Sequence, residues 1–447
     1  MIPKFHRIAA AILSACALGP GLLSGASMDS DLASAIGLGK RDALVRLLQA
    51  GVSPRDYADR GYSTLVVALR HGRDDMIPLL LEYQADPNEQ ESGVYPASLA
   101  AARGSGPALD LLIDRGAEIN RRDASGRTPL SWAILGAQTE SDHGDVIRRL
   151  VPLTRDYQMS CCDAAACGDV RALDMLLAAG AAVDTPLAAS GRTALMAAAA
   201  QGQSKAVKWL LAHGARAQAR DRHGRTALML AAMGPCPHGD VAEVAIALPA
   251  PSTGAVCYVE CATALIGGGA QVNEGDVSGN TPLMWAAMYG QTNVMRVLLR
   301  YDAKVNARSH SDETALIWAA REGHDAAAQQ LLAAGADCNL QNHNQYSALS
   351  TAILHQHDRV ADILLAAGAG ANGKGFKGVT PLMLAVIKNR VSSVELLLRA
   401  KADVMITNDF GFTALDLPKY VGVKSVLQSL LQHPETLTTN LNMNSDR

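Results

Sequence analysis

Hydrophobic positions recur at helical spacing in two short runs within residues 279–306. Thr281 and Pro282 predict a helix start, because a threonine hydroxyl caps the first turn and proline needs no N–H there. A thin apolar stripe follows, and Gly290 predicts the end of this first helix. A second helix is predicted over 293–300, where valines and leucines form one apolar face. Each helix is too short to be stable alone, so we expect the pair to pack antiparallel and to need neighbours.

The same pattern returns at a fixed interval along the chain. The triplet that begins the first helix has evenly spaced copies at Thr281, Thr314, Ser347, Thr380 and Thr413. Upstream, Thr193 and Thr226 are separated by the same interval. This period of about 33 residues, with T-P-L and A-A followed by L-L-x-x-G-A, resembles the ankyrin repeat. The resemblance covers residues 31–434.

The resemblance implies an all-α fold, an ankyrin-repeat solenoid of about 12 helix-turn-helix repeats that include two caps and are joined by short hairpins. We predict repeats 1–4 over 31–158, repeats 5–12 over 159–434 and a flexible tail over 435–447. The first division falls at an irregular fourth repeat. The seventh repeat, which runs from Thr226 to the next triplet, is longer than one period, and this predicts an inserted surface loop over 235–256.

Residues 1–26 have the pattern of a secretory signal peptide. A basic start at Lys4 and Arg7 precedes a short apolar run and an A-x-A-like cleavage site at 24–26. The run L-S-A-C that ends at Cys16 also resembles a bacterial lipobox, in which Cys16 would be lipidated after cleavage. We therefore expect an exported, periplasmic protein that is either soluble or held at the envelope through a lipid on Cys16.

Composition and motifs favour a binding role over catalysis. The formal net charge is −3, and nothing in the charge pattern is typical of a nucleic-acid partner. The sequence has no H-E-x-x-H, G-x-S-x-G or Walker motif. A G-x-G-x-x-G run at 373–378 follows a predicted helix instead of a strand and is interpreted as a hairpin tip. We expect a non-enzymatic monomer with no cofactor and no bound metal.

Three of the eight cysteines lie at the seventh-repeat insertion. In an exported protein such cysteines form disulfides more often than metal sites. Cys236 opens the insertion and Cys257 begins the helix after it, so we predict a bridge at the base of the loop, with Cys261 as an equally good partner. Two alternatives stay open: the cysteines are reduced, or they bind zinc together with His238. As an alternative function, the insertion with its cysteines and His238 would serve a ligand sensor, a metal sensor or an enzyme.

The resemblance implies that a concave face, built from hairpin tips and first helices, binds another protein. Side chains suited to an interface are concentrated in repeats eight to eleven. The predicted contacts are Met288, Tyr289, Arg308, His310, Arg321, Glu322, His343, Tyr346, His355, Phe376 and Lys388. Lys377, Phe410 and Phe412 lie at the same hairpin tips.

Two further sets of residues are interpreted as structural or solvated. Trp132, Trp285 and Trp318 each occupy the fourth position after a repeat threonine. This regularity favours packing between neighbouring first helices, with a ligand role for the last two as the alternative. His355 and His357 lack a third metal ligand at helical spacing and are interpreted as solvated.

Overall fold

The computed structural model describes residues 29–55, 63–137, 143–235 and 254–417. These residues form helices and turns with no β-strand, apart from two isolated bridges, so the all-α prediction is confirmed. The chain divides into two compact units, residues 1–219 with 237–254 and residues 220–236 with 255–447. The predicted leader, the predicted tail and residues 236–253 of the predicted insertion lie outside the described residues, and the predicted division after residue 158 stays a prediction.

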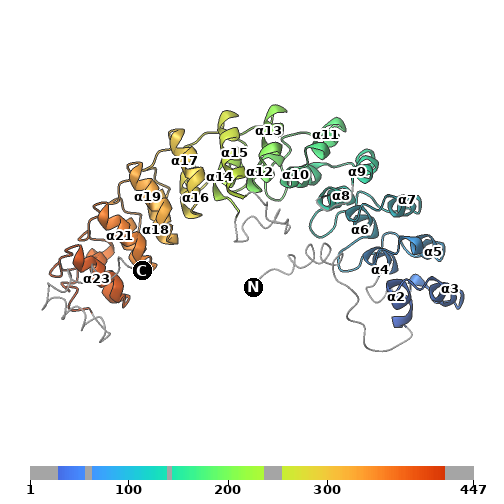
Figure 1. Ribbon diagram of the computed structural model, residues 1–447, viewed down its shortest axis with the longest axis horizontal. Helices are drawn as coiled ribbons and strands as arrows, with labels where there is room; N and C mark the ends of the chain where they lie inside the picture. The colour runs from blue at the N-terminus through green and yellow to red at the C-terminus, as the bar shows by residue number, and fades with distance from the viewer. Residues whose placement is uncertain (1–28, 56–62, 138–142, 236–253, 418–447) are drawn as a thin grey trace, which may run out of the picture. The chain divides into compact units, whose positions relative to one another are not determined.

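Within the first unit, helix pairs stack side by side in two rows (Figure 1). The first helices of the pairs are α2 (Asp29–Gly37), α4 (Thr64–Arg70), α6 (Pro96–Ala102), α8 (Pro129–Gly136), α10 (Gln158–Cys167) and α12 (Ala194–Ala200). The second helices are α3 (Arg41–Gln49), α5 (Ile77–Glu82), α7 (Gly106–Asp114), α9 (Gly144–Leu150), α11 (Val170–Ala178) and α13 (Ser204–Ala212), with short 3-10 turns at η2 (Asp74–Met76) and η3 (Val151–Leu153).

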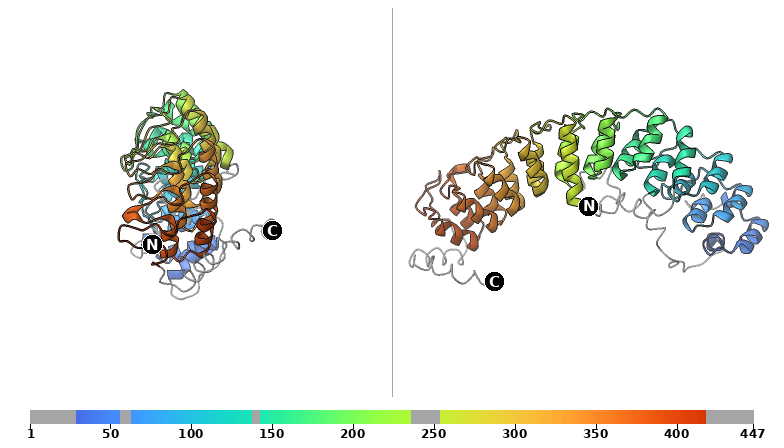
Figure 2. Two further views of the ribbon diagram at one scale, coloured as in Figure 1. Left: turned by 90° about the vertical axis from the view of Figure 1, so that its left-hand side faces the viewer. Right: turned by 45° about the horizontal axis from the view of Figure 1, so that its top comes forward.

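The second unit repeats this arrangement (Figure 2). Its first helices are α14 (Ala227–Met233), α16 (Pro282–Met288), α18 (Ala315–Glu322), α20 (Ala348–Leu354) and α22 (Pro381–Ile387). Its second helices are α15 (Gly254–Gly267), α17 (Thr292–Arg300), α19 (Asp325–Ala333), α21 (Asp358–Ala366) and α23 (Val391–Arg399), with a 3-10 turn at η5 (Phe376–Gly378).

The repeat threonine begins the first helix as the sequence predicts. In α16 the Thr281 hydroxyl accepts a hydrogen bond from the Met284 N–H at 3.4 Å, and Pro282 occupies the first helical position. Equivalent caps begin α12, α14, α18, α20 and α22. Behind each cap the small apolar residues are fully buried, so two short helices approach closely and bury their faces on each neighbour.

A polar turn shapes each hairpin, which we call a finger. In the finger before α16, the Asp276 carboxylate accepts the N–H groups of Ser278 and Asn280 at 2.8 and 2.9 Å. Adjacent fingers in the second unit are joined through their backbones. The His310 N–H donates to the Ser278 carbonyl at 2.9 Å, and the His343 N–H donates to the finger before it in the same way at 2.9 Å.

Neighbouring repeats also interlock through a side chain that lies over a glycine. Gly290 ends the first helix of its repeat with φ +63°, and a Cβ there would lie 2.8 Å from Nδ1 of His324. The same ring places Nε2 2.9 Å from a carbonyl oxygen at the end of α16, to which it donates. Gly323 and His357 repeat this glycine–histidine contact one period later.

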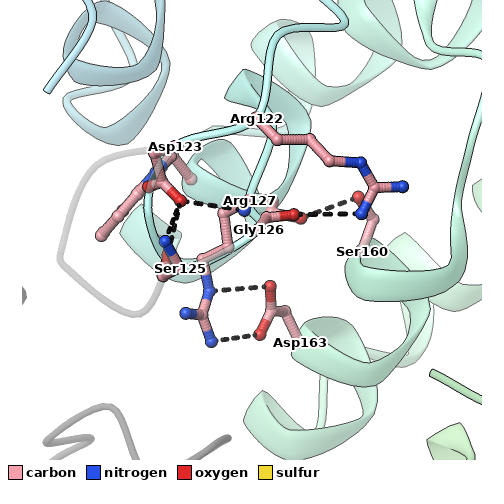
Figure 3. Close-up of polar contacts among 9 residues, drawn as sticks. Arg122, Asp123, Ser125, Gly126, Arg127, Ser160 and Asp163 are labelled. Atoms are coloured by element: carbon pink, nitrogen blue, oxygen red, sulfur yellow. Dashed lines mark hydrogen bonds and ion pairs between the residues drawn. The ribbon is translucent and has the colours of Figure 1, made fainter. Parts of the chain in front are cut away.

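The first unit contains a fully buried ion pair between adjacent repeats (Figure 3). Arg127, on the finger before α8, donates through Nε and Nη2 to the two carboxylate oxygens of Asp163 on α10 at 3.1 and 3.0 Å. Close by, the hydroxyls of Ser131 and Ser160 are 3.0 Å apart. The pair joins the finger before α8 to α10 through two parallel hydrogen bonds, and removing one partner would leave a buried charge unpaired.

Candidate protein-binding surface

An aromatic shelf lies on the first helices of the second unit. It consists of Trp285 and Tyr289 at α16 and Trp318 on α18. The rings of Trp285 and Tyr289 are stacked with centroids 6.3 Å apart, and Trp285 meets Trp318 edge-on at 5.6 Å. All three side chains are half-buried, so each keeps aromatic surface available for a partner.

A charged group completes the shelf on the α18 side. The Arg321 guanidinium lies 5.8 Å from the centroid of the Trp318 ring and forms an ion pair with Glu313. Glu313, whose side chain is only 11% exposed, also accepts from Nδ2 of Asn342 on the next finger at 3.0 Å. Because Asn342 also holds its carboxylate partner, Arg321 is positioned over the ring before any partner arrives.

Two of the repeat tryptophans hydrogen-bond to the polar turn of their own finger. The Trp132 indole donates to Asp123 at 2.7 Å, and the Trp285 indole donates to Asp276 at 3.2 Å. Trp132 is only 4% exposed, which confirms the packing interpretation for this residue. Trp285 is half-buried, so it combines packing with some accessible surface.

Trp318 lacks this hydrogen bond. The residue nine positions before it is Ser309, whose shorter hydroxyl already accepts the N–H groups of Ser311 and Glu313 at 3.3 and 3.2 Å. The Trp318 indole N–H is therefore buried without a hydrogen-bond partner in the described part of the chain. An unpaired donor of this kind costs about 1–3 kcal/mol.

The predicted contact residues form two groups at opposite ends of the first helices. The helix-end group is Met288, Tyr289, Arg321, Glu322, His355 and Lys388. The finger group is Arg308, His310, His343, Tyr346 and Phe376. A seven-residue helix separates the groups by about 10 Å, so one partner segment can touch both.

In the finger group, the imidazoles and the phenyl ring face solvent. His310, His343 and Phe376 are exposed, and Tyr346 is half-buried. Arg308 is occupied by the scaffold, since its guanidinium lies 3.1 Å from Asp312 and donates to a neighbouring carbonyl at 2.8 Å. The exposed rings of this group are therefore better placed for a partner than its arginine.

In the helix-end group, Tyr289 and Arg321 are connected through the shelf, because Tyr289 stacks on its first tryptophan and Arg321 lies over its second. Met288 is half-buried, while Glu322 and Lys388 are exposed. His355 is exposed as well. Partial burial and the charges of Arg321 and His357 lower the pKa of His355, so its neutral form is favoured at neutral pH.

The solvated interpretation is wrong for one of the histidines. His357 is half-buried, and its ring fills the space over Gly323 while Nε2 bonds a carbonyl oxygen at 2.9 Å. It is part of the contact between repeats, which helical spacing within one repeat does not reveal. Among the described residues no group of three or more potential metal ligands is present.

The cysteine predictions fall partly outside the described residues, which exclude Cys16, Cys236 and His238. On α15, Cys257 is half-buried and Cys261 is buried. No disulfide joins two cysteines of the described chain, and the bridge to Cys236 stays a prediction.

The remaining described cysteines are buried and serve packing. Burial raises the pKa of Cys161 to about 12, so its thiol is protonated at neutral pH and is a poor nucleophile. In the part of the chain that the structure describes, no helix has both the length and the apolar character needed to cross a bilayer.

Sequence reasoning missed Glu313 and Asn342, the residues that position Arg321. A signal was present in the repeat alignment. The residue before the repeat threonine is Arg225 or Asn280 in neighbouring repeats, and only the ninth repeat of this region places a carboxylate there. A buried acid at that position requires a cationic neighbour.

A comparison with known families agrees with this architecture. A family profile described as "Ankyrin repeats (3 copies)" matches residues 161–246, 254–342 and 326–408, more than half of the chain. Among solved structures, the ankyrin repeat domain of human ASB11, determined by crystallography, shares 28% identity, covers 53% of this chain and 97% of that one, and has a TM-score of 0.45.

Two similar curated proteins are matched over very different shares of their own length. Cyclin-dependent kinase 4 inhibitor B of Bos taurus is 35% identical over 131 residues, which are 29% of this chain and 95% of that protein. The inactive serine/threonine-protein kinase TEX14 of Bos taurus is 28% identical over 28% of this chain, and the match spans only 8% of its own length. The regular period, the capped helix pairs and the profile match agree that this chain belongs to the ankyrin repeat family, whose arrays are scaffolds for protein–protein interaction.

Proposed function

We propose that the chain is a non-enzymatic scaffold that binds a partner protein on the first helices and fingers of its second unit. The observation that carries the proposal is the aromatic shelf with Arg321 fixed over it. Tryptophan, tyrosine and arginine are the residue types that dominate the energetics of interface centres.

The geometry supports binding more than catalysis. The shelf offers aromatic surface for apolar contact and one guanidinium group for hydrogen bonds. Among the described residues that form it, no nucleophile lies beside a general base. Among similar proteins, a protein named as an inhibitor of cyclin-dependent kinase 4 is matched over 95% of its length, which supports a role in acting on another protein.

The test is a triple substitution on the helix-end group. Met288, Tyr289 and Arg321 are changed to alanine together, and the affinity for a partner isolated by cross-linking to the full chain is measured by calorimetry. Loss of two or three such anchors is expected to weaken binding at least about 30-fold, since each anchor contributes about 1–2 kcal/mol or more. Circular dichroism must show an unchanged helix content.

The matched control uses the same repeat position in the first unit. His71→Ala with Gln201→Ala removes side chains that also end first helices but lie far from the shelf in sequence. This variant is expected to bind normally. Equal affinity of the triple variant and the control would remove the shelf from the interface.

We also propose that this interaction takes place outside the cytoplasm, with the protein as a monomer that is either soluble in the periplasm or anchored by a lipid on Cys16. The signal-peptide pattern over residues 1–26 supports this, as does the lipobox-like run. Mass spectrometry of the mature N-terminus distinguishes the two forms, and an intact Met1 would contradict both.

The disulfide proposal follows from the same location. An oxidising compartment would favour a bridge from Cys236 to Cys257 or Cys261 at the base of the insertion. Peptide mapping under non-reducing conditions identifies the linked pair. Recovery of all three cysteines as thiols from the native protein would reject the bridge.

A further inference from the structure

The phenylalanines of this chain are placed unusually. The sequence contains four, and the structure describes three of them. Phe376, Phe410 and Phe412 are 51, 62 and 49% exposed and lie on two neighbouring fingers of the second unit. Phenylalanine is ordinarily among the most buried residue types, and exposed apolar clusters mark interaction sites.

A lysine lies between two of these rings. The Lys377 ammonium is 5.2 Å from the centroid of Phe376 and 5.6 Å from that of Phe410. The two fingers are tied together by the Asp409 N–H, which donates to the Lys377 carbonyl at 3.1 Å. We call Phe376, Lys377, Phe410 and Phe412 the phenylalanine finger patch.

The charge at the centre of the patch has no counterion in the described residues. None of the ion pairs formed among them involves Lys377. A cation held between two aromatic faces, with no acid paired to it, is complementary to a carboxylate that brings apolar groups with it.

The surroundings favour a protein segment over a membrane surface. Attraction to an anionic bilayer takes a cluster of about four to eight basic residues. In the two fingers that form the patch, residues 370–379 and 403–412, Lys374 and Lys377 are matched by Asp403 and Asp409, all of them exposed. Because the charges nearly balance, the patch has little long-range attraction for an anionic lipid surface. A carboxylate in direct contact with Lys377 is attracted at short range, where salt screens the interaction less.

We propose that the phenylalanine finger patch docks a segment of a partner protein in which an Asp or Glu side chain is flanked by apolar ones. The carboxylate pairs with Lys377, and the apolar side chains cover the three rings. The inference rests on the proposed protein-binding function and adds the chemistry of the partner.

The experiment uses a random twelve-residue peptide library displayed on phage and selected on the full chain. Selection on the natural chain is expected to enrich peptides with Asp or Glu next to Leu, Ile or Phe. On a chain carrying Phe376→Ser and Phe410→Ser this enrichment disappears. Measured by fluorescence anisotropy, an enriched peptide is expected to lose at least about tenfold in affinity, or about 1.4 kcal/mol.

A charge reversal makes the test specific. Lys377→Glu is expected to reject the acidic peptides and to enrich Lys or Arg beside apolar residues. Lys401→Glu is the matched control, because Lys401 is also exposed and has nearly the same backbone, φ +59° against +57°. It should leave the selected peptides unchanged, and unchanged urea midpoints show that each variant is folded.

Three outcomes would overturn the proposal. The first is that the natural chain and the chain carrying Phe376→Ser and Phe410→Ser select the same peptides. The second is that Lys401→Glu has the same effect as Lys377→Glu. The third is that vesicles of phosphatidylcholine and phosphatidylglycerol bind the patch while peptides do not. The proposed function and the patch can fail independently. If the triple alanine variant of the shelf no longer binds a natural partner while the Phe376→Ser, Phe410→Ser variant still binds it, the patch proposal is rejected and the proposed function is kept.

Discussion

The two units share one repeat pattern and differ in how far they expose their large apolar side chains. Both units bury an ion pair, Arg127 with Asp163 in the first and Arg225 with Asp221 in the second. In the first unit Trp132 is also only 4% exposed, whereas in the second unit the tryptophans of the aromatic shelf are half-buried and the phenylalanine finger patch is exposed. A tryptophan at the fourth position after the repeat threonine is therefore packed inside the first unit and left partly accessible in the second.

Exposed large apolar residues make the contrast quantitative. Within the described chain, Leu38 and Leu153 are the exposed ones of the first unit. The second unit has eight, namely Val277, Tyr301, Phe376, Ile387, Met405, Phe410, Phe412 and Leu415. Because both units have buried cores of the same kind, the surplus is not required by folding.

The largest expected effect comes from opening the buried ion pair. Asp163→Ala leaves the Arg127 charge buried without its partner and is expected to destabilise the first unit by about 3–5 kcal/mol. Urea unfolding followed by circular dichroism measures the loss. Asp145→Ala, which removes an exposed pair with Arg148, is the control and should cost at most about 1 kcal/mol. Equal losses would show that burial of the pair contributes nothing.

A methyl group tests the packing of the first unit. In Gly136→Ala the new Cβ would lie 2.1 Å from the Ala102 carbonyl oxygen, so α6 or α8 must shift, at a cost of about 1–3 kcal/mol or more. Gly267→Ala in the second unit meets nothing within 4 Å and should stabilise by up to about 1 kcal/mol. Thermal unfolding compares them, and a neutral Gly136→Ala would contradict the tight contact.

The tryptophans provide a smaller difference between the units. Trp132→Phe removes a buried indole and its hydrogen bond to Asp123 and is expected to cost about 1–2 kcal/mol. Trp318→Phe removes a donor that has no partner among the described residues, so its cost should be clearly lower. The two variants are compared by urea midpoint. A larger loss for Trp318→Phe would mean that its indole is paired in solution.

The smallest expected effect is a pH dependence that the units share. Burial lowers the pKa of His71 and of His355, and adjacent arginines lower both further. The unfolded chain therefore takes up more protons, and this stability is present above the unfolded pKa of about 6.5 and is lost as the pH falls below it. His71→Gln and His355→Gln should each reduce the fall in urea midpoint between pH 7.5 and 5.5. An unchanged fall would contradict the shifts.

Most of the fold was predictable because each repeat carries its own start and stop signals. Thr281, Pro282 and Gly290 delimited α16 correctly, and the period extended that result to the other helices. The exposure of His310, His343 and Phe376 was predictable as well, because these residues lie at the tips of the fingers. Their role in binding a partner stays a prediction.

The side-chain pairings of the site were less accessible. Arg321 was predicted as a contact residue without any neighbour to position it, and in the structure its position depends on Glu313 and on Asn342 from the next repeat. His357 was assigned to solvent because the glycine that receives it belongs to the preceding repeat. Such contacts join positions on different repeats, and hydrophobic periodicity within a repeat contains no information on them.

The glycine–histidine contacts have a consequence for how a repeat array gains or loses repeats during evolution. His324 and His357 each pack over a glycine of the preceding repeat, and the repeat that contains His324 also contains the glycine under His357. One repeat therefore supplies both a histidine for the repeat before it and a glycine for the repeat after it. When one such complete repeat is duplicated or lost, the repeats that become neighbours can form the same glycine–histidine contact. The number of repeats, and with it the length of the array, can therefore change during evolution without new contacts between repeats having to arise.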